Sequence, residues 1–406
     1  MHPLQWPAKL YGIQRNEMKR RRFASLLGGT ALASLARLPA YADPSDGCGV
    51  PNGRDDGWAV ISLDRDKLID RAALCRMTDG LVASGANVHS VLVARGGKLV
   101  FERYFKGLDE VPGYVYGRRV ANVAFDVDTL HDMKSVSKSV ASLGVGIAID
   151  KGLIRSVNEP IFSFFPELSD LRTPEKDRIL LLHALNMTMG LEWVEATPAT
   201  GDLANDEARM HMAQDPCRYV LGLAVTAPAG QEFHYNTGAL ALVSAVVRKA
   251  TGRPLDEFVL ANLFEPLGIS GGEWSRVRGD TDAGGGLRLR PREMAKIGQL
   301  VLAAGRWNDR QVVSRGWIEA STAPSIKATD DQFYGYLWWL GRVRANGREV
   351  HWIGALGRGG QSIRIVPELD LVVVVTAGYY QDYSPKAFQL QFGVFRDVVR
   401  ATLLLS

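Results

Sequence analysis

Apolar runs typical of β-strands occur near both ends of the chain. Residues 88–94 and 99–105 are rich in β-branched and aromatic side chains and flank Gly96-Gly97, which predicts a β-hairpin. Three similar runs follow in the C-terminal part, at residues 349–353, 363–366 and 371–376. The pattern therefore predicts that both ends of the chain contribute strands.

Helical periodicity fills much of the remaining chain. It marks residues 64–82, most of the middle from 139 to 281, and residues 385–405. Strands and a helix at both ends of a helical middle favour an α/β fold in which both chain ends complete one antiparallel sheet flanked by helices. The helical middle is then a lobe inserted into the sheet-bearing part.

These patterns predict one domain over residues 58–406, preceded by a Gly-, Pro- and Asp-rich linker at residues 43–57. We expect its sheet lobe to comprise about residues 58–138 and 282–406, and its helical lobe about residues 139–281. A cleft between two such lobes is the natural place for a ligand.

The basic residues of the chain are concentrated at its start. The net charge of the 406 residues is +4, but residues 1–42 alone carry seven basic side chains and one acidic one, so the rest is slightly acidic. Nucleic-acid binding therefore lacks an electrostatic basis, because it requires a basic surface on the folded part. We expect a small-molecule substrate, while the oligomeric state stays open.

The same N-terminal segment has the three parts of a secretory signal. Arg20-Arg21-Arg22-Phe23 is a twin-arginine pattern, residues 24–36 are apolar, and Ala40-Tyr41-Ala42 offers a cleavage site. The apolar run is shorter than the roughly 20 residues that span a membrane. We expect residues 1–42 to be removed and the mature protein to be periplasmic or secreted, with Met18 as an alternative start of translation.

Metal chemistry has no support in the sequence. Neither the three cysteines nor the seven histidines have the spacing of a metal site, so we expect no metal and no cofactor. In an oxidising compartment one disulfide can form, which leaves one thiol free. The spacing does not choose which pair among Cys48, Cys75 and Cys217 is bonded.

The strongest chemical signal is Ser135-x-x-Lys138 at the start of a long apolar helix. Residues three apart share one face of a helix, so these two side chains are expected to be neighbours. A serine hydroxyl needs an adjacent base to become a nucleophile, and a lysine whose pKa is lowered by burial can act as that base. The helix start adds backbone N–H groups that can stabilise an oxyanion. An ordinary capped helix start is the alternative explanation.

Two further segments can contribute to the same site. Tyr235-Asn236-Thr237-Gly238 precedes another helix, and a tyrosine there can project into a cleft, although packing at the helix entrance explains it equally well. Residues 354–361 contain four glycines and lead into a strand. Such glycines let a backbone approach a ligand closely, although a bend in a strand also accounts for them.

Taken together, the three segments resemble the class C β-lactamase-like serine hydrolases. This superfamily includes penicillin-binding peptidases, esterases and 6-aminohexanoate-dimer hydrolases, and Ser-x-x-Lys is its signature. The resemblance covers residue 57 to the C-terminus and includes further matching text at residues 148–154, 185–191, 284–289 and 334–339. It implies a β-lactamase/transpeptidase-like fold and an acyl-serine mechanism.

The resemblance also assigns roles to residues of this chain. Ser135 is similar to the acylated serine, Lys138 to its proton acceptor, and Tyr235 to the second proton-transfer group. The backbone N–H groups of Ser135 and Arg358 are expected to form the oxyanion hole. The resemblance implies contact with the substrate for Thr237, Gly357, Gly359 and Gly360.

Two departures from the family pattern bear on the substrate. Thr237 stands where the family commonly has an asparagine. The third motif, usually Lys-x-Gly or His-x-Gly, reads Ala355-Leu356-Gly357, so the cation that holds a β-lactam carboxylate is missing, although Arg358 could replace it. We therefore expect an amide or ester hydrolase. β-Lactamase or D-alanyl-D-alanine peptidase activity is the alternative.

Rival interpretations exist for both nucleophile and function. Gly268-Ile269-Ser270-Gly271-Gly272 matches the Gly-x-Ser-x-Gly elbow, but that elbow requires a preceding strand and a following helix, neither of which the pattern predicts. A non-catalytic penicillin-binding, peptidoglycan-binding or sensing protein is the alternative of a different class. The complete set of Ser135, Lys138 and Tyr235 favours an enzyme.

Overall fold

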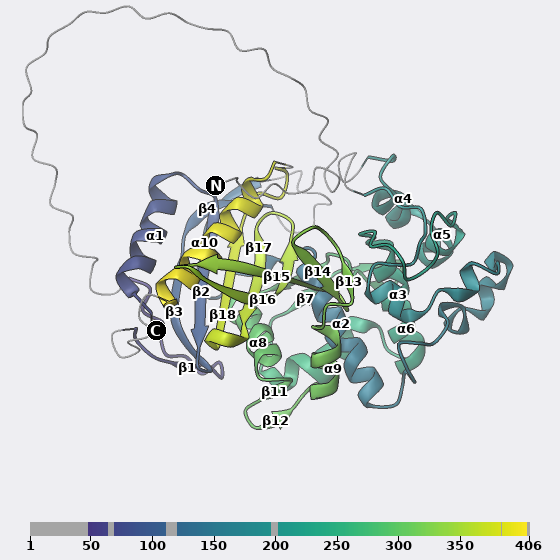
Figure 1. Ribbon diagram of the computed structural model, residues 1–406, viewed down its shortest axis with the longest axis horizontal. Coiled ribbons are helices and arrows are strands. Elements are labelled where there is room, and N and C mark those ends of the chain that lie inside the picture. Colours follow the sequence, from purple (N-terminus) through teal and green to yellow (C-terminus); the bar gives the residue numbers. More distant parts are fainter. Residues whose placement is uncertain (1–47, 64–68, 111–119, 196–201, 383, 404–406) are drawn as a thin grey trace, which may run out of the picture.

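The computed structural model describes residues 48–63, 69–110, 120–195, 202–382 and 384–403. Its centre is a nine-stranded sheet in the order β1-β3-β2-β18-β17-β16-β15-β14-β13 (Figure 1). The strands are β1 (Ala59–Val60), β2 (Val88–Arg95), β3 (Lys98–Tyr104), β13 (Ile326–Lys327), β14 (Gln332–Gly335), β15 (Trp338–Ala345), β16 (Arg348–Gly357), β17 (Gln361–Val366) and β18 (Leu371–Ala377). All neighbouring strands pair antiparallel except β1 and β3.

Both ends of the chain meet in the middle of this sheet, as predicted. The N-terminal hairpin β2–β3 joins the C-terminal strands through the pairing of β2 with β18, in which Val93 lies opposite Val373. Both strands are almost entirely buried, because helices cover the two faces of the sheet. The predicted α/β fold with an antiparallel sheet is confirmed, apart from the one parallel pair at its edge.

Helices cover the sheet on both faces. Helices α1 (Arg71–Ala83) and α10 (Lys386–Leu403) lie side by side over one face (Figure 1). Helix α8 (Pro291–Leu302) packs against β2, β17 and β18 on the other face, and α2 (Val136–Asp150) packs there against β16. Gly298 of α8 permits this packing, because a Cβ there would lie 2.5 Å from a methyl carbon of Val372. Ser135 thus lies at the start of a helix held firmly on the sheet.

The middle of the chain is mainly helical. Its helices are α3 (Leu181–Leu185), α4 (Asp206–Met212), α5 (Pro216–Gly222), α6 (Gly238–Thr251) and α7 (Leu255–Val259), followed by a π-helical turn (Leu260–Phe264). Short 3₁₀ segments lie at Ile161–Phe164, Pro166–Leu171, Lys176–Arg178, Glu265–Leu267 and Pro367–Leu369, and α9 (Arg315–Ser321) precedes the late strands. Helix α6 contacts α2, α3 and α5. The helical part therefore packs directly on the helix that begins after Ser135.

Short strands complete the structure. Strand β6 (His131–Asp132) immediately precedes the segment that carries Ser135 and pairs with β10 (Leu287–Leu289), and β10 pairs in turn with β7 (Glu273–Trp274). The remaining two-stranded pairs are β4 (Lys106–Glu110) with β5 (Val120–Ala124), β8 (Arg276–Val277) with β9 (Asp280–Thr281), and β11 (Arg306–Trp307) with β12 (Arg310–Gln311).

Two local details differ from the sequence patterns. The first helix begins at Arg71, after its N-cap Asp70, whereas the periodicity suggested residue 64; residues 64–68 lie outside the described part. Strand β16 continues through Gly354 to Gly357 instead of ending before the glycines. Gly354 accommodates the indole of Trp352, because a Cβ there would lie 2.9 Å from the ring. Gly354 therefore serves core packing.

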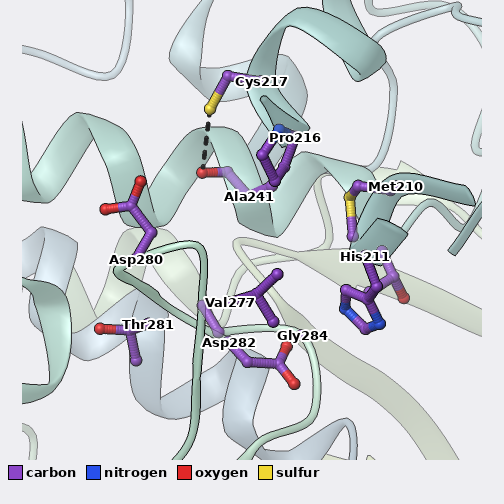
Figure 2. Close-up of a pocket in the computed structure, with 12 residues that line it drawn as sticks. Met210, His211, Pro216, Cys217, Ala241, Val277, Asp280, Thr281, Asp282 and Gly284 are labelled. Atoms are coloured by element: carbon purple, nitrogen blue, oxygen red, sulfur yellow. Dashed lines mark hydrogen bonds between the residues drawn. The ribbon is translucent and has the colours of Figure 1, made fainter. Parts of the chain in front are cut away.

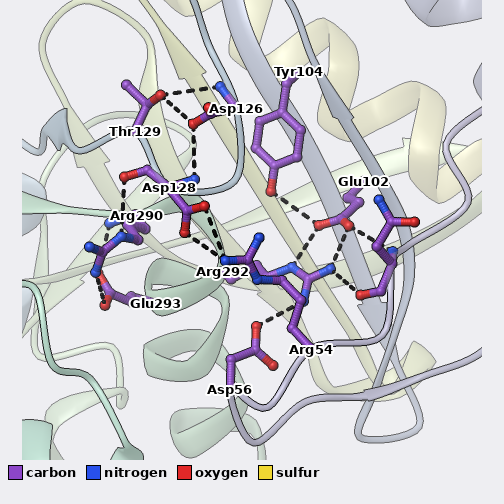
Figure 3. Close-up of polar contacts among 11 residues, drawn as sticks. Arg54, Asp56, Glu102, Tyr104, Asp126, Asp128, Thr129, Arg290, Arg292 and Glu293 are labelled. Carbon is purple, nitrogen blue, oxygen red and sulfur yellow. Dashed lines mark hydrogen bonds and ion pairs between the residues drawn. The ribbon is translucent and has the colours of Figure 1, made fainter.

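Polar contacts fix the segment that precedes the sheet (Figure 3). The guanidinium of Arg292, on α8, is buried and forms ion pairs with Glu102 of β3 and, at 2.8 Å, with Asp56. Arg54 pairs with Asp128 at 2.9 Å, and Asp128 in turn accepts a hydrogen bond from Arg290 through its backbone oxygen. Removing one partner of a buried ion pair costs about 3–5 kcal/mol. These contacts anchor the loop that leads into β6 and Ser135.

A disulfide joins Cys48 to Cys75 and ties the same N-terminal segment to α1. Cys217 is a free, buried thiol. The pairing that the sequence left open is thus assigned. The predicted signal at residues 1–42 lies outside the described residues. Within the described part, none of the helices is long and apolar enough to cross a membrane.

Candidate active site

Backbone pairing fixes the position of Ser135. Strand β6 ends at Asp132, and the N–H of Met133 then donates to the carbonyl oxygen of Leu287 at 2.9 Å. Ser137 reinforces the turn, because its hydroxyl donates to the carbonyl oxygen of Lys134 at 2.6 Å and accepts the N–H of Leu287 at 3.2 Å. Lys134 has a φ of 48°, in the left-handed region that non-glycine residues seldom adopt. The chain turns sharply just before the serine.

Ser135 and Lys138 are brought together as predicted. Lys138 Nζ donates to Ser135 Oγ at 2.9 Å and to the carbonyl oxygen of Gly284 at 2.7 Å. Ser135 is the N-cap residue of α2, yet its hydroxyl makes no capping hydrogen bond. The hydroxyl is therefore oriented toward the lysine.

Lys138 is buried, with 2% of its surface exposed. Burial lowers the pKa of its ammonium group, while the negative charges of Glu195, Glu207 and Asp282 partly oppose this effect. A lysine with a lowered pKa is more readily present as the neutral amine, which can accept the proton of a serine hydroxyl. The pair therefore has the geometry and electrostatics of a nucleophile and its base.

Tyr235 lies beside the lysine. Lys138 Nζ is 5.1 Å from the centre of the Tyr235 ring, so the cation faces the aromatic ring. Trp339 is stacked with the same ring at a centroid distance of 6.2 Å. Trp339 is almost fully buried, as are Trp338 and Trp352, so these indoles belong to the core. The structure thus brings Tyr235 to the Ser135–Lys138 pair.

Thr237 is engaged by a residue that sequence reasoning missed. Its N–H and its hydroxyl donate to the two carboxylate oxygens of Glu195, each at 2.7 Å. Trp193 Nε1 donates to the same carboxylate at 2.6 Å. Glu195 lies in a loop, where a single charged residue gives no pattern that could mark it. The proposed contact of Thr237 with substrate stays a prediction.

The end of β16 lies against the segment preceding the serine. A Cβ on Gly357 would lie only 2.4 Å from the carbonyl oxygen of Met133, so only glycine permits this approach. Arg358 follows directly, which places its backbone beside the start of α2. Gly359 and Gly360 have φ values of 85° and 103° and pack on Tyr380 and Ala377. The oxyanion and substrate roles of these residues remain predictions.

Two more acidic residues influence the site electrostatically. Burial raises the pKa of Glu207, on α4, to about 7, and the charges of Glu195 and Asp282 add to this rise. Lys138 and Arg358 oppose it with their positive charges. Arg358 follows β16 of the central sheet, and Glu207 lies on α4 of the helical middle. Charges from the sheet and from the helical middle therefore both act on the region around Lys138. Neither acid was anticipated from the sequence.

Thr237 and Gly284 line a small cavity. Figure 2 shows other residues of its lining. Its lining includes His211, Cys217 and Asp282, and Cys217 Sγ lies 3.7 Å from the carbonyl oxygen of Ala241. Burial raises the pKa of the Cys217 thiol to about 12, so the thiol stays protonated near neutral pH. Cys217 therefore adds no thiolate nucleophile to the site near neutral pH.

The rival serine lacks the setting of a nucleophile elbow. Gly268 ends a 3₁₀ turn in the left-handed conformation, and the short strand β7 follows Ser270. An elbow requires a strand before the serine and a helix after it. Among the described residues, no group of three or more His, Cys, Asp or Glu side chains could hold a metal ion.

Comparison with known proteins agrees with this geometry. The Beta-lactamase family model matches residues 76–386. The 6-aminohexanoate-dimer hydrolase of Paenarthrobacter ureafaciens is 26% identical over 340 residues, which cover 76% of this chain and 77% of that protein. Esterase EstB of Burkholderia gladioli is 26% identical over 218 residues, which cover 52% of this chain and 51% of the esterase.

Solved structures share the fold. A protein of Bacillus anthracis described as a 6-aminohexanoate-dimer hydrolase superposes with a TM-score of 0.66 at 19% identity, covering 88% of this chain and 90% of its own. A penicillin-binding protein homologue of Caulobacter crescentus gives a TM-score of 0.61 at 16% identity, with 84% and 98% covered.

Proposed function

The chain belongs to the Beta-lactamase family, and from this premise we propose that it is an exported serine hydrolase that cleaves a carboxylic amide or ester through an acyl-serine intermediate. The contact between Lys138 Nζ and Ser135 Oγ at 2.9 Å, with the lysine buried, carries the proposal. Relatives named as a 6-aminohexanoate-dimer hydrolase and an esterase support an amide- and ester-cleaving enzyme.

Acylation begins when neutral Lys138 takes the proton of Ser135. The Ser135 oxygen forms a bond to the carbonyl carbon of the substrate, and the negative charge that develops on the carbonyl oxygen is stabilised by the N–H groups of Ser135 and Arg358. The tetrahedral intermediate then breaks its bond to the leaving nitrogen or oxygen. That atom receives a proton through Tyr235, and Lys138 returns to the neutral state by giving its proton to the same relay.

Deacylation uses the same groups in reverse roles. A water molecule gives one proton to the Tyr235–Lys138 pair while its oxygen bonds to the acyl carbon. The bond to Ser135 then breaks, and the Ser135 oxygen recovers its proton. The products are a carboxylic acid and an amine or alcohol. No redox step or cofactor enters this sequence.

The substrate class follows from the third motif. Ala355 is fully buried on β16 and lies two residues before Gly357, on the same side of the strand. It offers no cation to a β-lactam carboxylate. An ester or a linear amide makes no such demand, and these are therefore the proposed substrates.

The decisive experiment combines labelling with a substrate panel. Purified protein is treated with a fluorophosphonate and analysed by mass spectrometry; we expect one adduct, on Ser135, and none in Ser135→Ala. Hydrolysis of p-nitrophenyl esters, 6-aminohexanoate dimer, D-Ala-D-Ala peptide and nitrocefin then ranks the substrates. An adduct on Ser270, or no adduct together with no turnover, would contradict an acyl-serine enzyme at Ser135.

Export is tested separately. The twin-arginine pattern and the Ala40-Tyr41-Ala42 site support removal of residues 1–42. N-terminal sequencing of the protein recovered from the periplasm or medium should begin at or near Asp43. A mature protein that retains Arg20 would refute this part of the proposal and leave the catalytic assignment intact.

A further inference from the structure

The carboxylate of Glu195 is held by three donors. One oxygen, Oε2, accepts Trp193 Nε1 at 2.6 Å and the N–H of Thr237 at 2.7 Å. The other, Oε1, accepts the hydroxyl of Thr237 at 2.7 Å. Three donors on one half-buried carboxylate fix its orientation. Protein groups thus bind both carboxylate oxygens of Glu195, which a loop glutamate does not need in order to be soluble.

Glu195 is connected to Lys138 through close packing. A Cβ on Gly284 would lie 2.5 Å from the Thr237 methyl group, so Thr237 rests directly on Gly284. The carbonyl oxygen of Gly284 accepts the hydrogen bond of Lys138 Nζ at 2.7 Å. Tyr235 lies two residues before Thr237 and faces the same ammonium. Glu195 therefore braces the segment that carries Tyr235 against the backbone that holds the lysine.

We propose that Glu195 is a positioning residue of this hydrolase: it fixes residues 235–237 beside Lys138 and supplies the negative charge that balances the ammonium formed when Ser135 loses its proton. The inference rests on the acyl-serine function proposed above. It assigns no contact between Glu195 and the substrate. Its consequence is that the charge of Glu195 helps to set the pH at which Lys138 becomes an active base.

The charged neighbours of Lys138 come from several elements. They are Glu195 in the loop before α4, Glu207 on α4 and Asp282 after β9, with the Tyr235 ring before α6 and with Arg358 after β16, which acts on Glu207. Glu195 raises the pKa of both Lys138 and Glu207. Loss of its charge therefore moves both titrations toward lower pH, whichever of the two groups limits the reaction.

Glu195→Gln separates charge from structure. The glutamine oxygen can accept Trp193 Nε1 and the N–H of Thr237, and its NH₂ group can donate to the Thr237 hydroxyl. All three hydrogen bonds are thus retained while the charge is lost. Trp193→Phe is the matched control, because it removes one hydrogen bond and leaves the charge in place.

The test measures the rate of fluorophosphonate labelling of Ser135 against pH. Labelling requires neutral Lys138, so the rate should rise with pH around a midpoint. We expect the midpoint to fall by about one pH unit in Glu195→Gln, at the lower end of the effect of a close opposite charge. Trp193→Phe should label more slowly with an unchanged midpoint. Glu207→Gln, which has no titrating carboxyl at that position, shows whether Lys138 alone produces the midpoint.

Glu195→Asp provides a second readout that does not depend on the stability of the glutamine variant. The aspartate keeps the charge, but its side chain is shorter by one methylene, so the charge lies farther from Lys138. The labelling midpoint of Glu195→Asp should therefore lie between those of the wild type and Glu195→Gln. A midpoint at or above the wild-type value in both variants overturns the charge-balancing role. Absence of a Ser135 adduct in the wild-type protein would instead overturn the proposed function itself.

Discussion

Gly357 lies so close to Met133 that a Cβ at position 357 would be 2.4 Å from the Met133 carbonyl oxygen. This contact joins the end of a sheet strand to the residue two places before Ser135. Arg358 follows this contact directly on the strand side, and Ser135, the proposed nucleophile, follows it after the turn at Lys134. The geometry of the proposed oxyanion hole therefore depends on an approach that only glycine allows.

Gly357→Ala is expected to damage catalysis more than stability. The added methyl must push the strand end from Met133, which displaces the Arg358 N–H from the oxyanion. Loss of one oxyanion donor typically lowers kcat about 10²–10³-fold. Ester hydrolysis and thermal unfolding measure the two effects. Gly393→Ala on α10 is the matched control, because a Cβ there meets nothing within 4 Å. Wild-type kcat in Gly357→Ala would contradict the oxyanion role.

Lys138→Met is expected to abolish labelling and turnover without lowering stability at pH 7. Burial depresses the folded-state pKa of Lys138, so the unfolded chain binds this proton more tightly. The wild-type stability therefore increases as pH rises from the folded-state pKa to the unfolded value near 10.5, and it is reduced below that window. A methionine side chain carries no charge, so the destabilisation that comes from burying a protonated lysine is absent from the variant. The carbonyl oxygen of Gly284 loses one hydrogen bond.

Urea unfolding at pH 7 and pH 10 checks this expectation. The difference in unfolding free energy between Lys138→Met and the wild type should favour the variant most at pH 7 and should diminish toward pH 10. Lys151→Met, at the exposed end of the same helix, should leave activity and the pH dependence unchanged. If the stability of Lys138→Met relative to the wild type were lower at pH 7 than at pH 10, a depressed lysine pKa would be contradicted.

Two buried histidines are expected to make the protein sensitive to acid. His89 and His131 are fully buried and both stack against Phe125, and neither ring nitrogen of His131 has a hydrogen-bond partner. Burial lowers the pKa of His89 to about 4 and that of His131 well below 6.5. Below pH 6.5 the unfolded chain takes up protons that the folded chain excludes, so stability falls as pH falls.

Each histidine contributes a loss of about 1.4 kcal/mol per pH unit once the pH is well below 6.5. Between pH 6.5 and 5 the two together should cost roughly 3 kcal/mol. Chemical unfolding in this range measures the slope, and His131→Phe should reduce it by about half. Equal slopes in wild type and His131→Phe would refute the explanation.

The sequence predicted the elements that follow a period or a motif. The hairpin around Gly96-Gly97 and the return of the C-terminal strands were visible because alternation and turn residues are local properties. The juxtaposition of Ser135 and Lys138 follows from helical spacing alone. These features required no knowledge of distant contacts.

Other parts of the site depend on tertiary contacts that no local pattern encodes. Glu195 is important only because the chain folds Thr237 and Trp193 onto its carboxylate. The acceptor of the lysine, a backbone oxygen of Gly284, has no side chain to reveal it. The burial of His131 likewise results from packing against Phe125 and His89.

The final prediction concerns the choice between esters and β-lactams. Ala355 cannot supply the cation that binds a β-lactam carboxylate and stabilises a Tyr235 phenolate. Loss of one close cation can raise the pKa of a neighbouring acid by about 1–3 units, and each unit corresponds to ~1.4 kcal/mol. Deacylation depends on the Tyr235 phenolate as its base, so the rate of deacylation should fall most. A penicillin should therefore acylate Ser135 slowly and leave more slowly still, whereas a p-nitrophenyl ester has a good leaving group and demands less of the base. We expect kcat/KM for short p-nitrophenyl esters to exceed that for nitrocefin, with β-lactams acting as weak inhibitors at best.

Arg358→Met tests whether that guanidinium replaces the missing cation: a selective loss of nitrocefin turnover would show that it does, and an equal loss for both substrates would assign Arg358 a role in positioning the backbone. Nitrocefin turnover as efficient as ester turnover in the wild-type protein would reverse the ranking and leave the assignment of Ser135 unaffected.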